Sequence, residues 1–191
     1  MTLLGIHVLG SPILRQETEI VTAVTDDVRQ LIDDMFETMY MARGIGLAAP
    51  QVGRRERVTV VDVDREGGRH HPIALINPTI VLREGSARGE EGCLSIPEIY
   101  GDVERATRVV VQATDREGQP FEVDGTYLLA RCLQHEVDHL HGKLFIDYLG
   151  IFKRRAALAK WEEEKVKYPT QVRLVTAEGG TVSAGRAERD G

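Results

Sequence analysis

The short stretch from Gln134 to Leu140 limits the possible folds of this chain more than any other, because it places several reactive groups at helical spacing. Within it the chain reads His135-Glu136-Val137-Asp138-His139. Residues four apart lie on one face of a helix, so His135 and His139 can offer imidazole nitrogens to one metal ion. Glu136 is then free to act as a general base toward a water molecule. The alternative is two ordinary histidines on a helix face beside a solvated glutamate.

The apolar residues around this motif favour the metal site. They are Leu128, Leu129, Cys132, Leu133 and Leu140. A helix that is apolar on so much of its surface is expected to be buried. A buried glutamate without a partner is costly, and a cation close to Glu136 would remove that cost.

The composition suits one globular domain. The chain has 191 residues, of which 42% are hydrophobic and 28% charged, and its net charge is −6. We expect a catalytic domain over residues 1–168 and a flexible tail over 169–191. The acidic balance argues against DNA binding, and no stretch approaches the length of a membrane span. Because no export signal is visible, we expect a cytoplasmic protein whose Cys93 and Cys132 remain free thiols.

A first helix is predicted to start after Thr25, a suitable N-cap that is followed by two aspartates. Apolar residues then recur at helical spacing from Val28 to Met39, and Gly44 is predicted to end the helix as its C-cap. The glycine-rich segment 44–53 is interpreted as a tight loop between this helix and a strand. A phosphate-binding loop is the alternative, but no Lys-Ser/Thr pair follows, and the segment leaves a helix instead of opening one.

Strands and turns are predicted for much of the remaining chain. Residues 1–24 form an extended arm with a turn, and Thr176–Gly191 is expected to be largely disordered. Asn77-Pro78 is predicted to be a turn. The predicted strands are 57–63, 73–76 and 79–82, followed by a hairpin of 108–114 with 120–123. A last helix is predicted from about Phe152 to Lys167.

A catalytic metal site needs a third protein ligand. The metzincin pattern requires a third histidine where this chain has Phe145, so that pattern fails. A glutamate from 162–164 is a second possibility, but a solvated helix face explains that charged cluster better. The remaining candidate is Cys93, which follows Gly92 and becomes a strong thiolate ligand beside a dication.

Three motifs stand in order along the chain: Gly44-Ile45-Gly46-Leu47-Ala48-Ala49-Pro50-Gln51, Glu91-Gly92-Cys93-Leu94-Ser95 and Gln134-His135-Glu136-Val137-Asp138-His139. Together they closely resemble the motifs of the peptide deformylases, over roughly residues 5–160 of this chain. The resemblance implies that Cys93, His135 and His139 hold one divalent metal. Ferrous iron is the expected cellular metal, and zinc, nickel or cobalt can take its place in a purified sample.

The resemblance also implies the reaction. The substrate is the N-formyl-methionine end of a new polypeptide, and formate is released. Glu136 is the general base and then the general acid, and the Gln51 side chain and the Leu94 N–H are the oxyanion donors. Further residues are expected to bind the substrate. Backbone groups of Ile45, Gly46 and Gly92 would pair with the peptide, and Leu128, Arg131 and Cys132 would border the methionine pocket.

Some features depart from the family pattern or lie outside it. Tyr100 stands where many members carry an arginine that meets the substrate backbone. An ion pair of Glu91 with Arg105 could brace the Cys93 loop. The C-terminal helix could dock on the ribosome through its basic residues 153–155, although the acidic residues 162–164 argue against this.

The fold is predicted to be α+β, with mostly antiparallel sheets around the central helix that carries His135 and with N-terminal and C-terminal helices outside. Two rival functions remain. A zinc endopeptidase would cleave internal peptide bonds and keep its activity in Cys93→Ser. A non-enzymatic binding domain would release no formate, and Glu136→Gln would have no effect on it.

Overall fold

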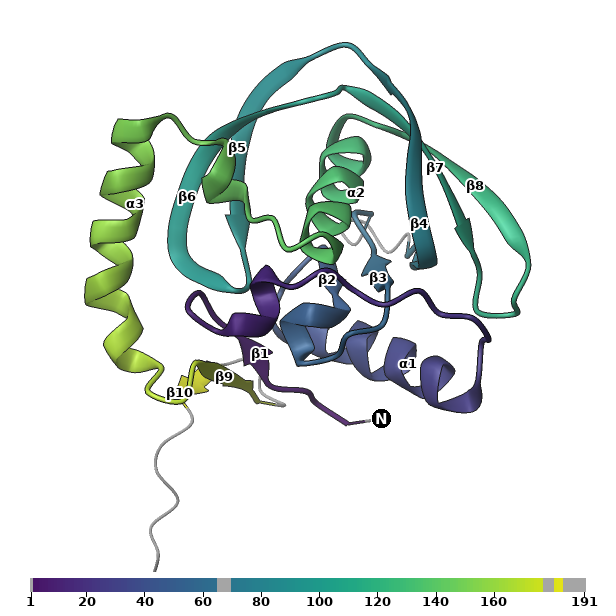
Figure 1. Ribbon diagram of the computed structural model, residues 1–191, viewed down its shortest axis with the longest axis horizontal. Coiled ribbons are helices and arrows are strands. Elements are labelled where there is room, and N and C mark those ends of the chain that lie inside the picture. The colour runs from purple at the N-terminus through teal and green to yellow at the C-terminus, as the bar shows by residue number, and fades with distance from the viewer. Residues whose placement is uncertain (1, 65–69, 177–180, 184–191) are drawn as a thin grey trace, which may run out of the picture.

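The computed structural model describes residues 2–64, 70–176 and 181–183. These ranges contain three α-helices, α1 (Asp26–Met41), α2 (Tyr127–Leu140) and α3 (Ile151–Glu164), with antiparallel sheets between them. The predicted α+β arrangement is therefore confirmed, including a central helix that carries the paired histidines (Figure 1). None of the helices in these ranges is long and apolar enough to cross a membrane.

The strands form three sheets. The five-stranded sheet consists, in spatial order, of β2 (Gly46–Ala48), β3 (Val58–Val61), β4 (Ile73–Glu84), β7 (Arg108–Thr114) and β8 (Pro120–Thr126). The two-stranded sheet is a hairpin of β5 (Ala87–Cys93) and β6 (Ile96–Arg105). The third sheet consists of β1 (Ile6–His7), β9 (Val172–Val175) and β10 (Thr181–Ser183). Short 3-10 helices cover Pro12–Arg15, Ala49–Val52, Phe145–Tyr148 and Lys165–Lys167.

Helix α2 lies in the middle of these elements (Figure 1). It packs against β2, β3, β7 and β8, so the five-stranded sheet fixes its position. Ala130 and Leu133 are fully buried and join Val109 and Val111 of β7 in one apolar cluster. Each buried leucine of this kind contributes roughly 1.5–3 kcal/mol. The face of α2 away from this cluster is left to meet β5 and the loop before β2.

Helix α1 starts where the sequence predicts and ends earlier. The Thr25 hydroxyl accepts a hydrogen bond from the Val28 N–H at 3.4 Å, so the predicted N-cap is confirmed. The prediction of Gly44 as the C-cap is wrong, because the helix ends at Met41 and Arg43 takes the left-handed conformation (φ 59°). Gly44 is instead a point of close approach, since a Cβ there would lie 2.7 Å from the side chain of Leu94.

Two other predictions of local structure were wrong. Residues 73–84 form one continuous strand, β4, in which the predicted turn at Asn77 is a bulge. Asn77 adopts φ 53°, and its side-chain amide both accepts from the Val21 N–H and donates to the Val21 carbonyl. The segment 44–53 is not only a loop, because it contains β2. Its backbone pairs with β3, from Gly46 opposite Val61 to Ala48 opposite Thr59.

Of the β7–β8 and β5–β6 hairpins, the sequence predicted only the first. The predicted hairpin of 108–114 with 120–123 is confirmed as β7 and β8. The β5–β6 hairpin was missed, because its first strand is rich in glycine and glutamate and lacks the usual apolar alternation. This hairpin curves around α2 on the side away from β7 (Figure 1).

Helix α3 lies outside the hairpin and packs against β6. Its Trp161 is buried against the hairpin side of the core, whereas most of its other side chains face solvent. The chain then returns to the N-terminal arm, where β9 pairs with β1 and Ile6 stands opposite Arg173. The predicted tail thus contains an ordered strand. The disorder predicted for 176–191 concerns mostly residues outside the described ranges.

Candidate metal centre

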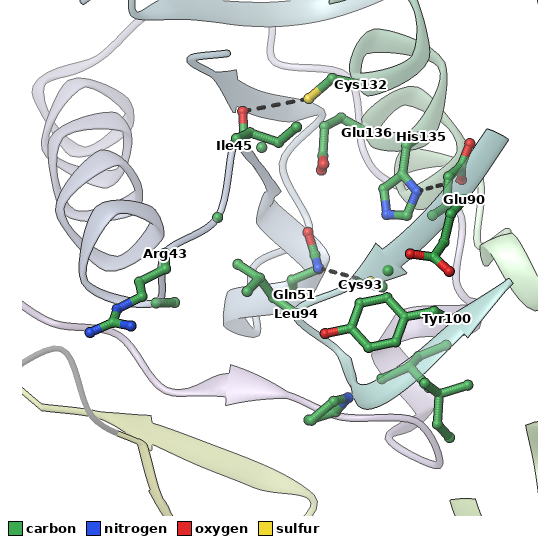
Figure 2. Close-up of a pocket in the computed structure, with 18 of the residues that line it drawn as sticks. Arg43, Ile45, Gln51, Glu90, Cys93, Leu94, Tyr100, Cys132, His135 and Glu136 are labelled. Carbon is green, nitrogen blue, oxygen red and sulfur yellow. Dashed lines mark hydrogen bonds and ion pairs between the residues drawn. The ribbon is translucent and has the colours of Figure 1, made fainter. Parts of the chain in front are cut away.

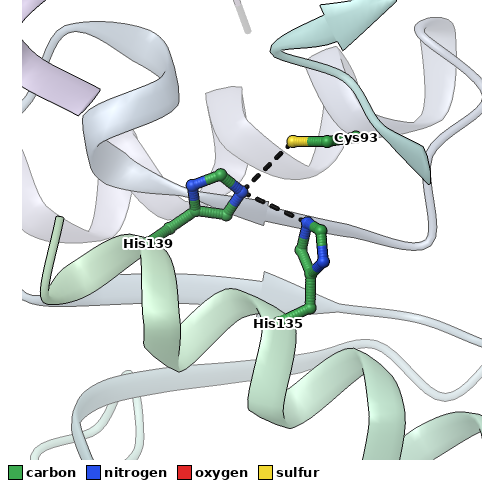
Figure 3. Close-up of side chains that lie close together, drawn as sticks. All are labelled: Cys93, His135 and His139. Carbon is green, nitrogen blue, oxygen red and sulfur yellow. Dashed lines mark hydrogen bonds between the residues drawn. The ribbon is translucent and has the colours of Figure 1, made fainter. Parts of the chain in front are cut away.

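The structure brings together the three side chains that the sequence proposes as metal ligands. Cys93 Sγ lies 3.2 Å from His139 Nε2, which lies 3.2 Å from His135 Nε2 (Figure 3). All three atoms lie within 4.8 Å of one another. Cys93 ends strand β5, and the two histidines project from successive turns of α2. The cluster forms because the β5–β6 hairpin brings Cys93 to the two histidines of α2.

Glu91 fixes the orientation of the first histidine. His135 Nδ1 lies 3.0 Å from Glu91 Oε2, and both side chains are buried. The predicted ion pair with Arg105 is confirmed, because Arg105 donates to both carboxylate oxygens of Glu91, at 2.9 and 3.0 Å. Burial by itself would raise the pKa of Glu91, but hydrogen bonds from His135 and Arg105 lower it to about 2. Glu91 is therefore an anion that holds a proton on His135 Nδ1 and leaves Nε2 with a lone pair.

This arrangement fits a cation. Two imidazole nitrogens and a sulfur, each able to present a lone pair, face a common point at close range. Cysteine and two histidines form a donor set for zinc or for another first-row divalent metal. Burial by itself lowers the pKa of both histidines. For His139 the net pKa is well below its ordinary value, whereas for His135 hydrogen bonds to Cys93 and Glu91 outweigh burial and raise the pKa.

Glu136 follows His135 on α2 and lies beside it at the cavity (Figure 2). It is only 4% exposed, and its Oε2 is buried without a hydrogen-bond partner among the described residues. Burial, helped by the nearby carboxylates of Glu91 and Asp138 and opposed by His135, raises the pKa of Glu136 to about 7. A carboxyl group in this condition can both take up and release a proton near neutral pH.

Gln51 faces the cluster from the 3-10 helix after β2. Its Oε1 accepts the Ala48 N–H at 2.8 Å, which fixes the orientation of the amide. Its Nε2 therefore points to Ser95 Oγ, at 3.1 Å, and to Cys93 Sγ, at 3.5 Å. Gln51 is 1% exposed, so this donor is held in place by burial as well as by hydrogen bonds.

A cavity of about 640 Å³ lies over this group, and most of the sequence-predicted site residues line it (Figure 2). The lining includes Ile45, Gly46, Gln51, Gly92, Cys93, Leu94, Leu128, Arg131, Cys132, His135 and Glu136. His139, which is 1% exposed, lies beneath it. A Cβ on Gly46 would collide with Glu136 and stand 2.8 Å from Cys132 Sγ, so the site needs glycine there.

Arg131 differs from the other predicted pocket residues. Its guanidinium donates to Glu91 Oε1 at 2.8 Å, to the Val103 carbonyl at 2.9 Å and to the Ala87 carbonyl at 2.9 Å. These contacts tie both strands of the β5–β6 hairpin to α2. Arg131 lines the cavity with part of its surface, but its charged end braces the hairpin that carries Cys93.

Three of the further residues that line the cavity have side chains that bear on the site: Tyr100, whose role the sequence leaves open, and Tyr168 and Arg173, which the sequence analysis missed. Tyr100 is 62% exposed, and its ring covers Gly92, where an added Cβ would stand 2.7 Å from Tyr100 Cε1. Tyr168 and Arg173 reach the same cavity from the segment after α3. No local pattern marks these two, because their role depends on the pairing of β9 with β1.

The chain matches the model of the polypeptide deformylase family over residues 3–155. It is 55% identical to a peptide deformylase of Alkalilimnicola ehrlichii over 163 residues, which cover 85% of this chain and 91% of the relative. It is 48% identical to that of Nitrosococcus oceani, covering 86% of this chain and 98% of the relative. Among solved structures, a peptide deformylase from Legionella pneumophila superposes with a TM-score of 0.81 at 45% identity, covering 86% and 96% of the two chains. The chain therefore belongs to the polypeptide deformylase family of hydrolases.

Proposed function

We propose that this protein removes the N-formyl group from the formyl-methionine at the start of new polypeptides and releases formate. One observation carries the proposal: a buried glutamate with an unpartnered carboxylate oxygen stands beside a Cys-His-His cluster in an open cavity. Family membership supplies the substrate class.

Cys93, His135 and His139 would hold one divalent metal. When bound, such a metal lowers the pKa of a water molecule and polarises a carbonyl oxygen. Ferrous iron is our proposal for the metal in the cell, by resemblance to the family. Zinc, nickel or cobalt can replace it, because cysteine and histidine bind all four metals. Glu91, held by Arg105 and Arg131, keeps His135 in the tautomer that a ligand requires.

Glu136 is the proton carrier of the proposed reaction. It takes a proton from the attacking water and passes it to the amine nitrogen as the carbon–nitrogen bond of the formamide breaks. Formate and a free α-amine are then the products. The raised pKa of Glu136 suits both steps, because neither state of the carboxyl group is strongly favoured near neutral pH.

Gln51 and Leu94 are the proposed donors to the negative oxygen that develops during the attack. The fixed amide of Gln51 presents Nε2 next to Cys93, and Leu94 is the residue after that ligand. Loss of a donor of this kind typically reduces turnover by roughly 10²–10³-fold.

The peptide is proposed to bind along backbone groups of Ile45, Gly46 and Gly92, as an added strand would. Leu128 and Cys132 border the cavity near Glu136 and would receive the methionine side chain together with the stem of Arg131. Tyr100, which is 62% exposed, lines the same cavity at the position where many family members carry an arginine.

The proposal is tested by formate release from formyl-Met-Ala-Ser after anaerobic purification, with metal analysis of the same sample. Acetyl-Met-Ala-Ser is the control, because it keeps the peptide and enlarges the group to be removed. We expect formate from the first peptide and no deacylation of the second. An endopeptidase would instead cut an internal bond of a longer peptide, and a preparation that contains metal but releases no formate would exclude the proposed reaction.

Two finer points belong to the same proposal. We place the protein in the cytoplasm, a proposal that agrees with two cysteines that form no disulfide. We also propose that α3 docks on the ribosome through its basic end. Arg155 lies in this exposed stretch, so Arg155→Glu should weaken co-sedimentation with ribosomes at low salt and leave tripeptide turnover unchanged. Co-sedimentation equal to that of the unaltered protein would argue against docking.

A further inference from the structure

Arg173 is a buried arginine that reaches the active-site cavity from a strand outside the family match. It lies in β9, eighteen residues after the last residue matched by the family model (173 − 155), and its side chain is 8% exposed. Its Nη1 donates to the Leu94 carbonyl oxygen at 3.0 Å. It lines the same cavity as Cys93 and Leu94.

The segment that Arg173 contacts is the turn between β5 and β6. This turn follows the ligand Cys93 directly and contains the proposed oxyanion donor Leu94. Gln51 fixes it through Ser95 Oγ, and the Leu9 N–H donates to the Ser95 carbonyl at 2.8 Å. Arg173 adds a hydrogen bond at Leu94 itself, from the opposite end of the sequence.

Packing alone does not explain why a charged arginine stands at this buried position. No carboxylate within the described ranges forms an ion pair with it, and its Nε is buried without a hydrogen-bond partner. Burial of a charge without an ion-pair partner is unfavourable, and it lowers the pKa of the guanidinium although Tyr168, Cys93 and Glu98 act in the opposite direction. An apolar residue on this face of β9 would avoid that cost. The contact with Leu94 is therefore the feature for which an arginine at this position is needed.

We propose that Arg173 is a positioning residue of the active site: its guanidinium holds the Leu94 carbonyl so that the Leu94 N–H keeps the orientation of an oxyanion donor. The strand β9 then belongs to the catalytic unit, which extends beyond the boundary predicted at residue 168. This inference rests on the proposed function, because the donor matters only if an acyl group is attacked there.

The alternative is that Arg173 merely fills space between β9 and β1. Val175 provides a matched control, because it lies two residues along the same strand, shares the same face and is also buried, at 8% exposure. Val175 is not among the residues that line the cavity. Val175→Ala should therefore loosen β9 without a direct effect on Leu94.

The experiment compares Arg173→Met, Arg173→Lys and Val175→Ala with the unaltered protein, all loaded with the same metal. Deformylation of formyl-Met-Ala-Ser, metal content, thermal stability and amide hydrogen exchange at residues 94 and 95 are measured. We expect Arg173→Met to lower kcat about tenfold with KM nearly unchanged, because a supporting contact of a transition-state donor is lost. Exchange at 94 and 95 should accelerate, and Arg173→Lys should recover part of kcat.

Val175→Ala should lower the melting temperature with kcat and exchange at Leu94 unchanged. If Arg173→Met keeps the kcat of the unaltered protein, the inference is wrong and the proposed function stands. The inference is also wrong if Val175→Ala loses as much kcat as Arg173→Met. If the unaltered, metal-loaded protein releases no formate, the proposed function fails, and unchanged exchange at Leu94 in Arg173→Met would then separately contradict the contact.

Discussion

Helices α2 and α3 have the same length, 14 residues, and opposite surroundings. Nine side chains of α2 are buried, including Gln134, His135, Glu136 and His139, whereas Trp161 is the buried side chain of α3. Polar groups buried in α2 must find partners inside the protein. The atoms that do not, Glu136 Oε2 and His139 Nδ1, therefore stand out as functional candidates. Most polar groups of α3 face water, so a group without a protein partner there carries no such information.

The same contrast applies to the ion pairs. On α3, Lys153 pairs with Asp102 at 2.9 Å, and both side chains are about half exposed, so the pair contributes little. Next to α2, Arg105 and Glu91 are 5% and 4% exposed in their side chains, and loss of either partner would leave a buried charge. Burial, more than the number of charges, decides which of these residues the site depends on.

The largest expected effect is that of Glu136→Gln in α2. The amide keeps the shape of the side chain but cannot accept the proton, so formate release should fall by roughly 10²–10⁴-fold. Metal content should be retained, and the melting temperature should not decrease, because a neutral group is easier to bury. Glu163→Gln, on the exposed face of α3, is the matched control and should leave turnover unchanged. Retained turnover in Glu136→Gln would remove Glu136 from the mechanism.

The sequence predicted the features that lie within one helix better than the contacts between distant segments. The burial of α2 and its paired histidines could be predicted, because spacing along one helix fixes which side chains share a face. The pairing of Cys93 with them could be proposed through three motifs in order. The bracing role of Arg131 and the reach of Arg173 to Leu94 could not, because both depend on contacts between segments far apart in the chain.

The next effect in size concerns packing. Leu133 in α2 is fully buried, and Leu133→Ala should reduce the free energy of unfolding by roughly 2–5 kcal/mol. Leu158 in α3 is 37% exposed, and the same change there should cost only roughly 0.5 kcal/mol. Urea unfolding of the two variants measures both values. Equal losses of unfolding free energy in the two variants would show that Leu158 contributes to the core as much as Leu133 does, despite its exposure.

Removal of the metal should affect α2 and leave α3 unchanged. A metal present at 100 times its dissociation constant would stabilise the native protein by about 2.7 kcal/mol. Treatment with a chelator should therefore lower the melting temperature and accelerate amide exchange in α2 and at the end of β5, which carry the proposed ligands. Exchange in α3 should not change. Uniform acceleration would mean that the metal stabilises the whole fold and not the region around α2.

The smallest effect is expected at the start of α3, where Ile151 and Phe152 are 73% and 83% exposed. Because these side chains are in water already, replacing both with serine should change the free energy of unfolding by no more than about 0.5 kcal/mol per site. Turnover of a free tripeptide should be unchanged. A loss of several kcal/mol in urea unfolding would show that another part of the chain covers the apolar start of α3. The difference in burial between α2 and α3 would then not hold for this end of α3.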